Sequence, residues 1–180
     1  MVQRSNPFAV PVVSLRRKHF WRCVPQPHLR TILESGPSFS RDRRYSVRGE
    51  FGALYFSASE DLALVEVAAR SGEDGEPACS VEFEVSVGRL ADLTRQEIRA
   101  RWRVRLEDLV RPRIARDAYS APQAIARRVY EQGLDGLLAP SVHDPQGQRR
   151  DWFNLVLYPA NLIRPLLREV RVRQVGPPLR

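Results

Sequence analysis

The segment LYFSASEDLALVEVAAR, residues 54–70, predicts a strand, a tight turn and a helix in direct succession. ALYFS at 53–57 is rich in the residues that favour strands. Ser59 is well placed to cap the helix, and Glu60 and Asp61 in its first turn complement the helix dipole. The helix is expected to run to about Arg70, before SGEDGEP ends it.

One charged residue interrupts this otherwise apolar helix. Leu62, Val65, Glu66 and Ala69 share a face at helical spacing, and their neighbours leave no obvious solvent side. Glu66 is therefore expected to be at least partly buried. An ionised carboxylate out of water needs a partner, for which arginine is the natural candidate. From the helix alone, a fixed ion pair, an acid reaching water at the edge of the stripe and a functional carboxylate all remain open.

Composition indicates an ordinary globular chain. Its 180 residues match one domain, with 43% hydrophobic and 28% charged residues. No apolar run approaches the roughly 18 residues that a membrane span needs. The short apolar patch at 8–15 precedes its basic cluster, which is the reverse of a secretory signal. We therefore expect a cytoplasmic protein with no membrane association.

The two cysteines, Cys23 and Cys79, suggest neither a disulfide framework nor a zinc site. The net charge is +8, and 28 of the 29 basic residues are arginine. Arginine alternates with apolar residues in 99–116 and 166–175, which predicts extended segments with one charged, solvated face. No nucleic-acid-binding motif accompanies the charge, so an acidic protein or a phosphate-bearing small molecule would suit it equally.

The remaining pattern predicts a mixed α+β domain at residues 19–175, with a lead-in at 1–18 and a tail at 176–180. A polar loop at 38–52 is long enough to be functional. TRQE at 94–97 has the pattern of a capping box. Expected besides the 53–70 unit are strands at 19–24, 79–87, 136–141 and 153–159, and helices at 27–36 and 120–133.

Six short motifs in this order resemble the RES domain family. They span about 140 residues, and they are Trp21-Arg22, Arg44-Tyr45-Ser46, Leu54-Tyr55, Glu66, Pro140-Ser141 and Asn154 to Pro159. The chain departs from the family twice. Asp42 and Arg43 replace glycines that commonly precede the loop arginine, and Tyr45 replaces the usual tryptophan.

The resemblance implies an ADP-ribosyltransferase-like split β-sheet flanked by helices. It also implies the toxin of a type II toxin-antitoxin pair with an Xre-type antitoxin, in which the toxin itself is not expected to bind DNA directly. NAD would be the substrate, cleaved at its nicotinamide-ribose bond with water or phosphate as acceptor. An ADP-ribosyltransferase that modifies a protein is the alternative. A non-catalytic basic binding module is the third hypothesis.

The resemblance also assigns roles to residues. Glu66 would stabilise the oxocarbenium-like transition state. Arg22 and Arg44 would bind the pyrophosphate, unless they serve only as partners of Glu66. Tyr55 and Tyr45 would flank the nicotinamide, although Tyr55 could equally be core, and Ser141 would orient Glu66 or the ribose. Glu66→Gln is expected to keep the fold and lose the activity.

Several other residues receive no catalytic assignment. His143 and Asp144 read as a surface loop, Asn154 as an anchor of the last core strand and Ser57 as an alternate hydroxyl. Because no Walker motif, Rossmann glycine pattern or metal-binding cluster appears, we expect no cofactor and no metal. NAD would be consumed rather than held.

Overall fold

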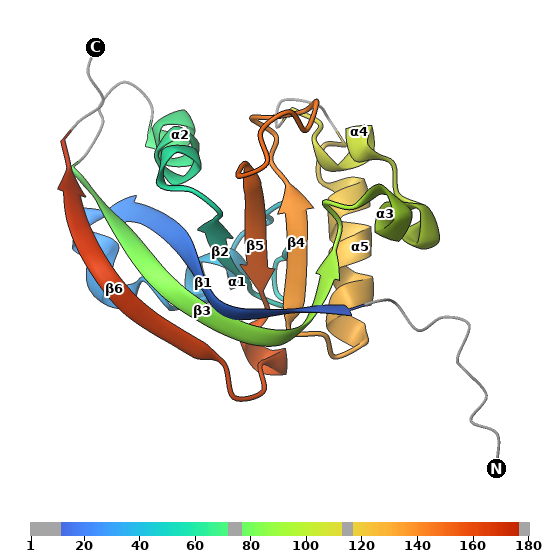
Figure 1. Cartoon of the computed structure of the whole chain (residues 1–180), viewed down its shortest axis with the longest axis horizontal. Helices are drawn as coiled ribbons and strands as arrows, with labels where there is room; N and C mark the ends of the chain where they lie inside the picture. Colours follow the sequence, from blue (N-terminus) through green and yellow to red (C-terminus); the bar gives the residue numbers. More distant parts are fainter. Residues whose placement is uncertain (1–11, 72–76, 113–116, 177–180) are drawn as a thin grey trace.

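The computed structural model describes residues 12–71, 77–112 and 117–176. In this part of the chain, six strands form one sheet in the order β1-β2-β5-β4-β3-β6, and β1 also pairs with β3 (Figure 1). The strands are β1 (Val12–Pro25), β2 (Leu54–Ser57), β3 (Ala78–Asp92), β4 (Gly136–Pro140), β5 (Phe153–Leu157) and β6 (Leu166–Val175).

The sheet has two halves. In one half, β3 is antiparallel to both β6 and β1, and in the other half β5 is antiparallel to both β2 and β4. The halves join where β3 runs parallel to β4, through Leu90–Gly136 to Asp92–Leu138, and where Trp21 of β1 pairs with Ser57 of β2. The expected α+β class with one mixed domain is confirmed.

Helices cover this sheet in two groups. Figure 1 shows α2 (Glu60–Ser71) apart from the other long helix, α5 (Ser120–Glu131), which lies beside β4 together with α3 (Gln96–Trp102) and α4 (Leu106–Leu109). Short helical turns are α1 (Gly36–Phe39), η1 (Gln26–Thr31) and η2 (Pro159–Asn161). In the described residues, no helix is long and apolar enough to cross a membrane.

Two apolar clusters form the core. One packs α3, α4 and α5 against the sheet and includes Trp102, Leu109, Ile125 and Val156. The other lies between the two halves of the sheet and includes Phe20, Phe56, Phe83 and Leu155. Because alternate residues of a strand face opposite sides, burial of Leu54 and Phe56 in the second cluster directs Tyr55 and Ser57 away from it.

The strand-turn-helix unit at 53–70 is confirmed. The Leu62 N–H donates to Ser59 Oγ at 3.4 Å, so Ser59 caps α2 as expected. The strands at 79–87, 136–141 and 153–159 and the helix at 120–133 are also present, within a few residues of the expected ends.

Four local predictions are wrong. Residues 27–36 do not form one α-helix: η1 ends at Thr31, and Gly36 begins α1 because Pro37 suits the first helical turn. The capping box at 94–97 is absent, since Thr94 donates to Asp92 instead. Strand β1 begins at Val12 rather than at residue 19, because it continues to pair with the end of β3.

The fourth error is the extended segment predicted at 99–116. Its described part forms α3 and α4, because Ile98 and Trp102, one helical turn apart, are both buried in the first core cluster. By contrast, 166–175 is strand β6 with a mostly exposed face, as predicted. Residues 1–11 of the predicted lead-in at 1–18 and residues 177–180 of the predicted tail at 176–180 lie outside the described residues, as do 72–76 and 113–116.

Candidate functional site

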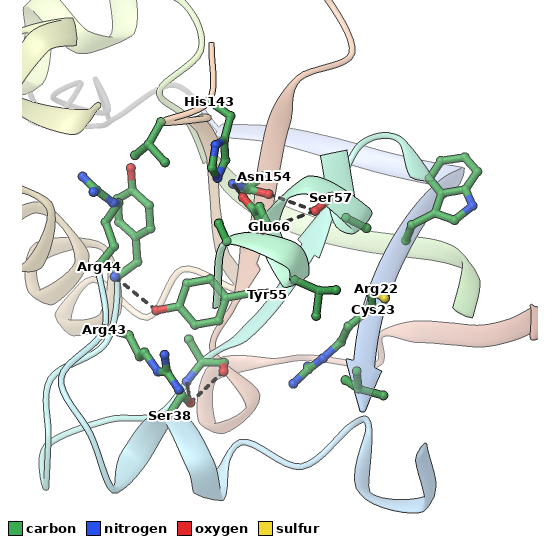
Figure 2. Close-up of a pocket in the computed structure, with 18 of the residues that line it drawn as sticks. Arg22, Cys23, Ser38, Arg43, Arg44, Tyr55, Ser57, Glu66, His143 and Asn154 are labelled. Carbon is green, nitrogen blue, oxygen red and sulfur yellow. Dashed lines mark hydrogen bonds between the residues drawn. The ribbon is translucent and has the colours of Figure 1, made fainter. Parts of the chain in front are cut away.

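A pocket of about 470 Å³ lies beside α2, within the range of small-molecule sites. Its walls come from β1, the segment before β2, β2 itself, α2, β5, the turn after β4 and the ends of the segment between α4 and α5 (Figure 2). Five of the six residues predicted for the site line it, namely Arg22, Arg44, Tyr45, Tyr55 and Glu66.

Glu66 projects from α2 into this pocket and is half-buried. Asn154 Nδ2 donates a hydrogen bond to Glu66 Oε1 at 2.7 Å. Ser57 Oγ lies 3.5 Å from Glu66 Oε2 and 3.3 Å from Asn154 Oδ1. The pairing of β2 with β5 sets Ser57 directly opposite Asn154, so the sheet register builds the cradle for the acid.

Tyr55 ties the loop to the sheet. Its hydroxyl accepts a hydrogen bond from the Tyr45 N–H at 3.1 Å and donates to Ser46 Oγ at 3.3 Å. The ring of Tyr55 remains in the pocket wall (Figure 2). The hydroxyl is thus used to fix the loop, which leaves the ring face as the surface that Tyr55 offers to a ligand.

Tyr45 is 2% exposed, although it lines the pocket. Its hydroxyl has no hydrogen-bond partner among the described residues. Burial raises the pKa of the Tyr45 phenol well above its ordinary value, and the nearby Arg44 guanidinium opposes this only in part. Tyr45 is therefore a neutral donor at neutral pH.

Arg44 has its guanidinium turned into the protein. It donates to the carbonyl oxygens of Leu109 at 2.8 Å, Arg111 at 2.7 Å and Ala118 at 3.5 Å. It also lies 5.5 Å over the ring of Tyr119. These contacts hold the backbone on both sides of 113–116, so Arg44 fixes a wall of the pocket.

Arg22 and Arg43 are arranged differently. Figure 2 shows both side chains reaching into the same part of the pocket, Arg22 from β1 and Arg43 from the loop. The Arg22 guanidinium also lies 5.9 Å from the ring centroid of Phe56. Two guanidinium groups in one part of a pocket form a site suited to phosphate oxygens. In the sequence, Arg43 was notable only as a departure from the family pattern.

Ser141 is the predicted site residue that lies behind the wall. It is fully buried, and its hydroxyl accepts the N–H of His143 at 3.1 Å. The turn that it shapes places Val142 and His143 on the pocket instead. The buried position of Ser141 therefore does not favour a direct contact with Glu66 or with a ligand.

Three further residues lie in the pocket although the sequence did not predict it. Asn154 was expected only to anchor a strand, His143 was expected in a surface loop, and Arg43 received no role. The signal for Asn154 was available, since a polar residue in FNLVLYP interrupts an apolar strand. Nothing in the local pattern around His143 predicted its place.

Comparisons with known proteins come to the same fold. The crystal structure of the M. tuberculosis MbcT-MbcA toxin-antitoxin complex contains a chain with a TM-score of 0.67 and 18% identity. The match covers 92% of this chain and 86% of that one. No curated protein sequence matches the chain. The model of the RES domain matches residues 19–175, and the chain therefore belongs to the RES domain family.

Proposed function

We propose that the pocket binds NAD and that Glu66 promotes cleavage of its nicotinamide-ribose bond. The observation that carries this proposal is the Glu66 carboxylate at the pocket wall, oriented by Asn154 at 2.7 Å and by Ser57 at 3.5 Å. A carboxylate fixed in this way can stabilise positive charge that develops on a bound sugar without having to move.

The chemistry needs such a group. When the bond to nicotinamide breaks, the ribose acquires oxocarbenium character, and a nearby carboxylate stabilises the positive charge. Nicotinamide leaves as a neutral molecule, so the departing group needs no proton. Glu66 therefore acts in its ionised form, with one oxygen held by Asn154 and the carboxylate turned toward the ribose.

The other pocket residues suit the rest of NAD. Arg22 and Arg43 would bind the pyrophosphate, because guanidinium groups make charge-assisted contacts with phosphate oxygens. Arg44 would act through the wall that it holds, a change from the role assigned on sequence alone. The ring of Tyr55 would stack against the nicotinamide, and the almost fully buried Tyr45 would support the pocket wall beside it.

In the cell, we propose that this activity makes the protein the toxin of a type II toxin-antitoxin pair. Membership of the RES family supports this role, and so does the fold shared with a chain of the MbcT-MbcA complex. The partner would be an Xre-type antitoxin. Expression without the antitoxin is expected to stop bacterial growth, and Glu66→Gln is expected to relieve the arrest.

The direct test is incubation of the purified protein with NAD while free nicotinamide is followed. Release of nicotinamide is expected, with ADP-ribose or its phosphate as the second product. Transfer of label from adenine-labelled NAD onto a protein would instead identify an ADP-ribosyltransferase. No nicotinamide release, together with harmless expression in bacteria, would overturn the proposal.

A further inference from the structure

The turn after β4 is held rigidly by groups behind the pocket wall. The Ser141 hydroxyl accepts the His143 N–H at 3.1 Å, and the Ser141 carbonyl accepts the Asp144 N–H at 3.2 Å. The carboxylate of Asp144, itself buried, accepts the N–H groups of Gln148 at 3.0 Å and Arg149 at 2.8 Å. The position of His143 is therefore fixed on both sides along the chain.

The imidazole of His143 lines the pocket and is half-buried. Figure 2 shows the ring on the same side of the pocket as Asn154 and Glu66 and turned toward them. No group in residues 12–71, 77–112 and 117–176 bonds to either ring nitrogen. By contrast, His19 binds Glu82 at 2.7 Å. Among the described residues, the imidazole of His143 therefore lines the pocket without a hydrogen bond to either ring nitrogen, and a ligand or water in the pocket can bond to it.

Several charged or titratable groups line the pocket with His143. They come from α2, β1, β2, the segment before β2 and the start of α5, and they are Glu66, Arg22, Cys23, Tyr55, Glu34, Arg43, Arg44, Tyr45 and Tyr119. Of these, Figure 2 draws the Glu66 carboxylate on the side of His143, and Arg22 and Arg43 in the other part of the pocket. An imidazole can lose and gain a proton near neutral pH, which arginine cannot do.

We propose that His143 is the general base that activates water as the acceptor, so that the reaction is hydrolysis. This rests on the proposed cleavage of NAD. The water oxygen forms a bond to the anomeric carbon of the ribose while the bond from that carbon to the nicotinamide nitrogen breaks. The bonding electron pair stays on the nicotinamide nitrogen. The proton of the water passes to the unprotonated nitrogen of His143 and then to solvent, and the products are ADP-ribose and nicotinamide.

The choice of acceptor gives this proposal a sharp consequence. Water is a weak nucleophile and needs a base to take its proton, whereas phosphate at neutral pH is already an anion. Loss of the base should therefore slow hydrolysis while leaving attack by phosphate far less affected. General base catalysis of this kind contributes about 10²- to 10⁴-fold to a rate.

The test uses the full chain with His143→Gln, which keeps a hydrogen-bonding side chain of similar reach but cannot take up a proton. His28→Gln is the matched control, because His28 is exposed on η1 and does not line the pocket. Nicotinamide release is measured from pH 5 to 9 (about the range in which histidine titrates), first without phosphate and then with added inorganic phosphate. Melting temperatures check that both variants fold.

The expected result is a loss of hydrolysis by about 10²-fold or more in His143→Gln. The fall of the wild-type rate toward acid pH should also disappear, and added phosphate should restore part of the rate as ADP-ribose phosphate. Wild-type hydrolysis in the variant, or equal losses with and without phosphate, would overturn the role of His143. So would a wild-type protein that releases nicotinamide only when phosphate is present. If the wild type releases none under either condition, the proposed function itself fails.

Discussion

Two regions of the molecule hold the carboxylates of their glutamates on different elements and in different surroundings. On the outer face of β6, β3 and β1, Glu84 lies between Arg17 at 3.8 Å and Arg168 at 3.3 Å. Glu82 likewise lies between His19 at 2.7 Å and Arg171 at 3.1 Å. In the pocket, the Glu66 carboxylate is oriented by the amide of Asn154 and lies beside the hydroxyl of Ser57.

The comparison distinguishes charged residues that stabilise the sheet from a charged residue that is placed to act on a ligand. The arginines of β6 engage glutamates of the same sheet or, for Arg173, Glu60 at the start of α2. Much of the basic charge in 166–175 is thereby compensated, which argues against a basic binding module on this face. Glu66 is held in direction at the wall of a cavity, where its negative charge can act on a bound cationic group.

Breaking the orientation of Glu66 should have a large effect on activity. Asn154→Asp replaces a donor 2.7 Å from Glu66 with a second carboxylate. Two neighbouring carboxylates raise the pKa of one, so nicotinamide release should fall by roughly 10²-fold. Initial rates at pH 7 test this. Ser57→Ala should cost less, because its contacts are 3.3 and 3.5 Å long. A wild-type rate in Asn154→Asp would count against the cradle.

Arg44→Lys tests whether an arginine at the pocket is structural. A lysine cannot bridge the carbonyls of Leu109, Arg111 and Ala118, so the free energy of unfolding should fall by about 2 kcal/mol. Urea denaturation measures the loss, with the exposed Arg41→Lys as control. Unchanged stability with a raised KM for NAD would instead make Arg44 a phosphate ligand.

Glu84→Gln probes the sheet face. Its side chain is 10% exposed but its partners Arg17 and Arg168 are 79% and 62% exposed, so solvent screens both pairs. The free energy of unfolding should fall by about 1 kcal/mol, and nicotinamide release should not change. A loss of activity without a loss of stability would show that this face contributes to the reaction.

The smallest effect concerns Glu50, whose exposed carboxylate accepts hydrogen bonds from Arg127 of α5 at 2.8 and 2.9 Å. The hydrogen bond with Arg127 lowers the pKa of Glu50. Its stabilising contribution is therefore present above the unfolded pKa of about 4.3 and is lost as pH falls through the lower folded value. Glu50→Gln should slightly lower the free energy of unfolding at pH 7 and leave it equal to that of the wild type at pH 2. Urea denaturation midpoints of both proteins at the two pH values test this. A larger loss at pH 2 than at pH 7 would contradict it.

Local patterns predicted the strands and α2, because alternation and helical spacing are properties of neighbouring residues. They did not predict α3 and α4, where alternating arginines mimic a strand and only burial of Ile98 and Trp102 decides for a helix. Five of the six site residues that were assigned from the family motifs line one pocket. The local sequence could not predict which groups those side chains contact.

Long-range register explains that limit. Asn154 reaches Glu66, 88 residues away, only because β2 pairs with β5 in one register. The carbonyl partners of Arg44 lie 65 to 74 residues away. Such contacts depend on how whole helices and strands pack. The motif therefore identified Arg44 as a site residue but could not predict where its guanidinium points. The buried place of Ser141 behind the wall has the same origin.

Glu66 is proposed to act on NAD, whereas the glutamates of the sheet face are expected to be structural. The most direct test measures nicotinamide release by Glu66→Gln and Glu82→Gln side by side with the wild type, at equal folded concentration. We expect Glu82→Gln to match the wild type and Glu66→Gln to lose activity by about 10²- to 10³-fold while keeping its fold. Equal activity of the wild type and Glu66→Gln would contradict the account and return Glu66 to a structural role.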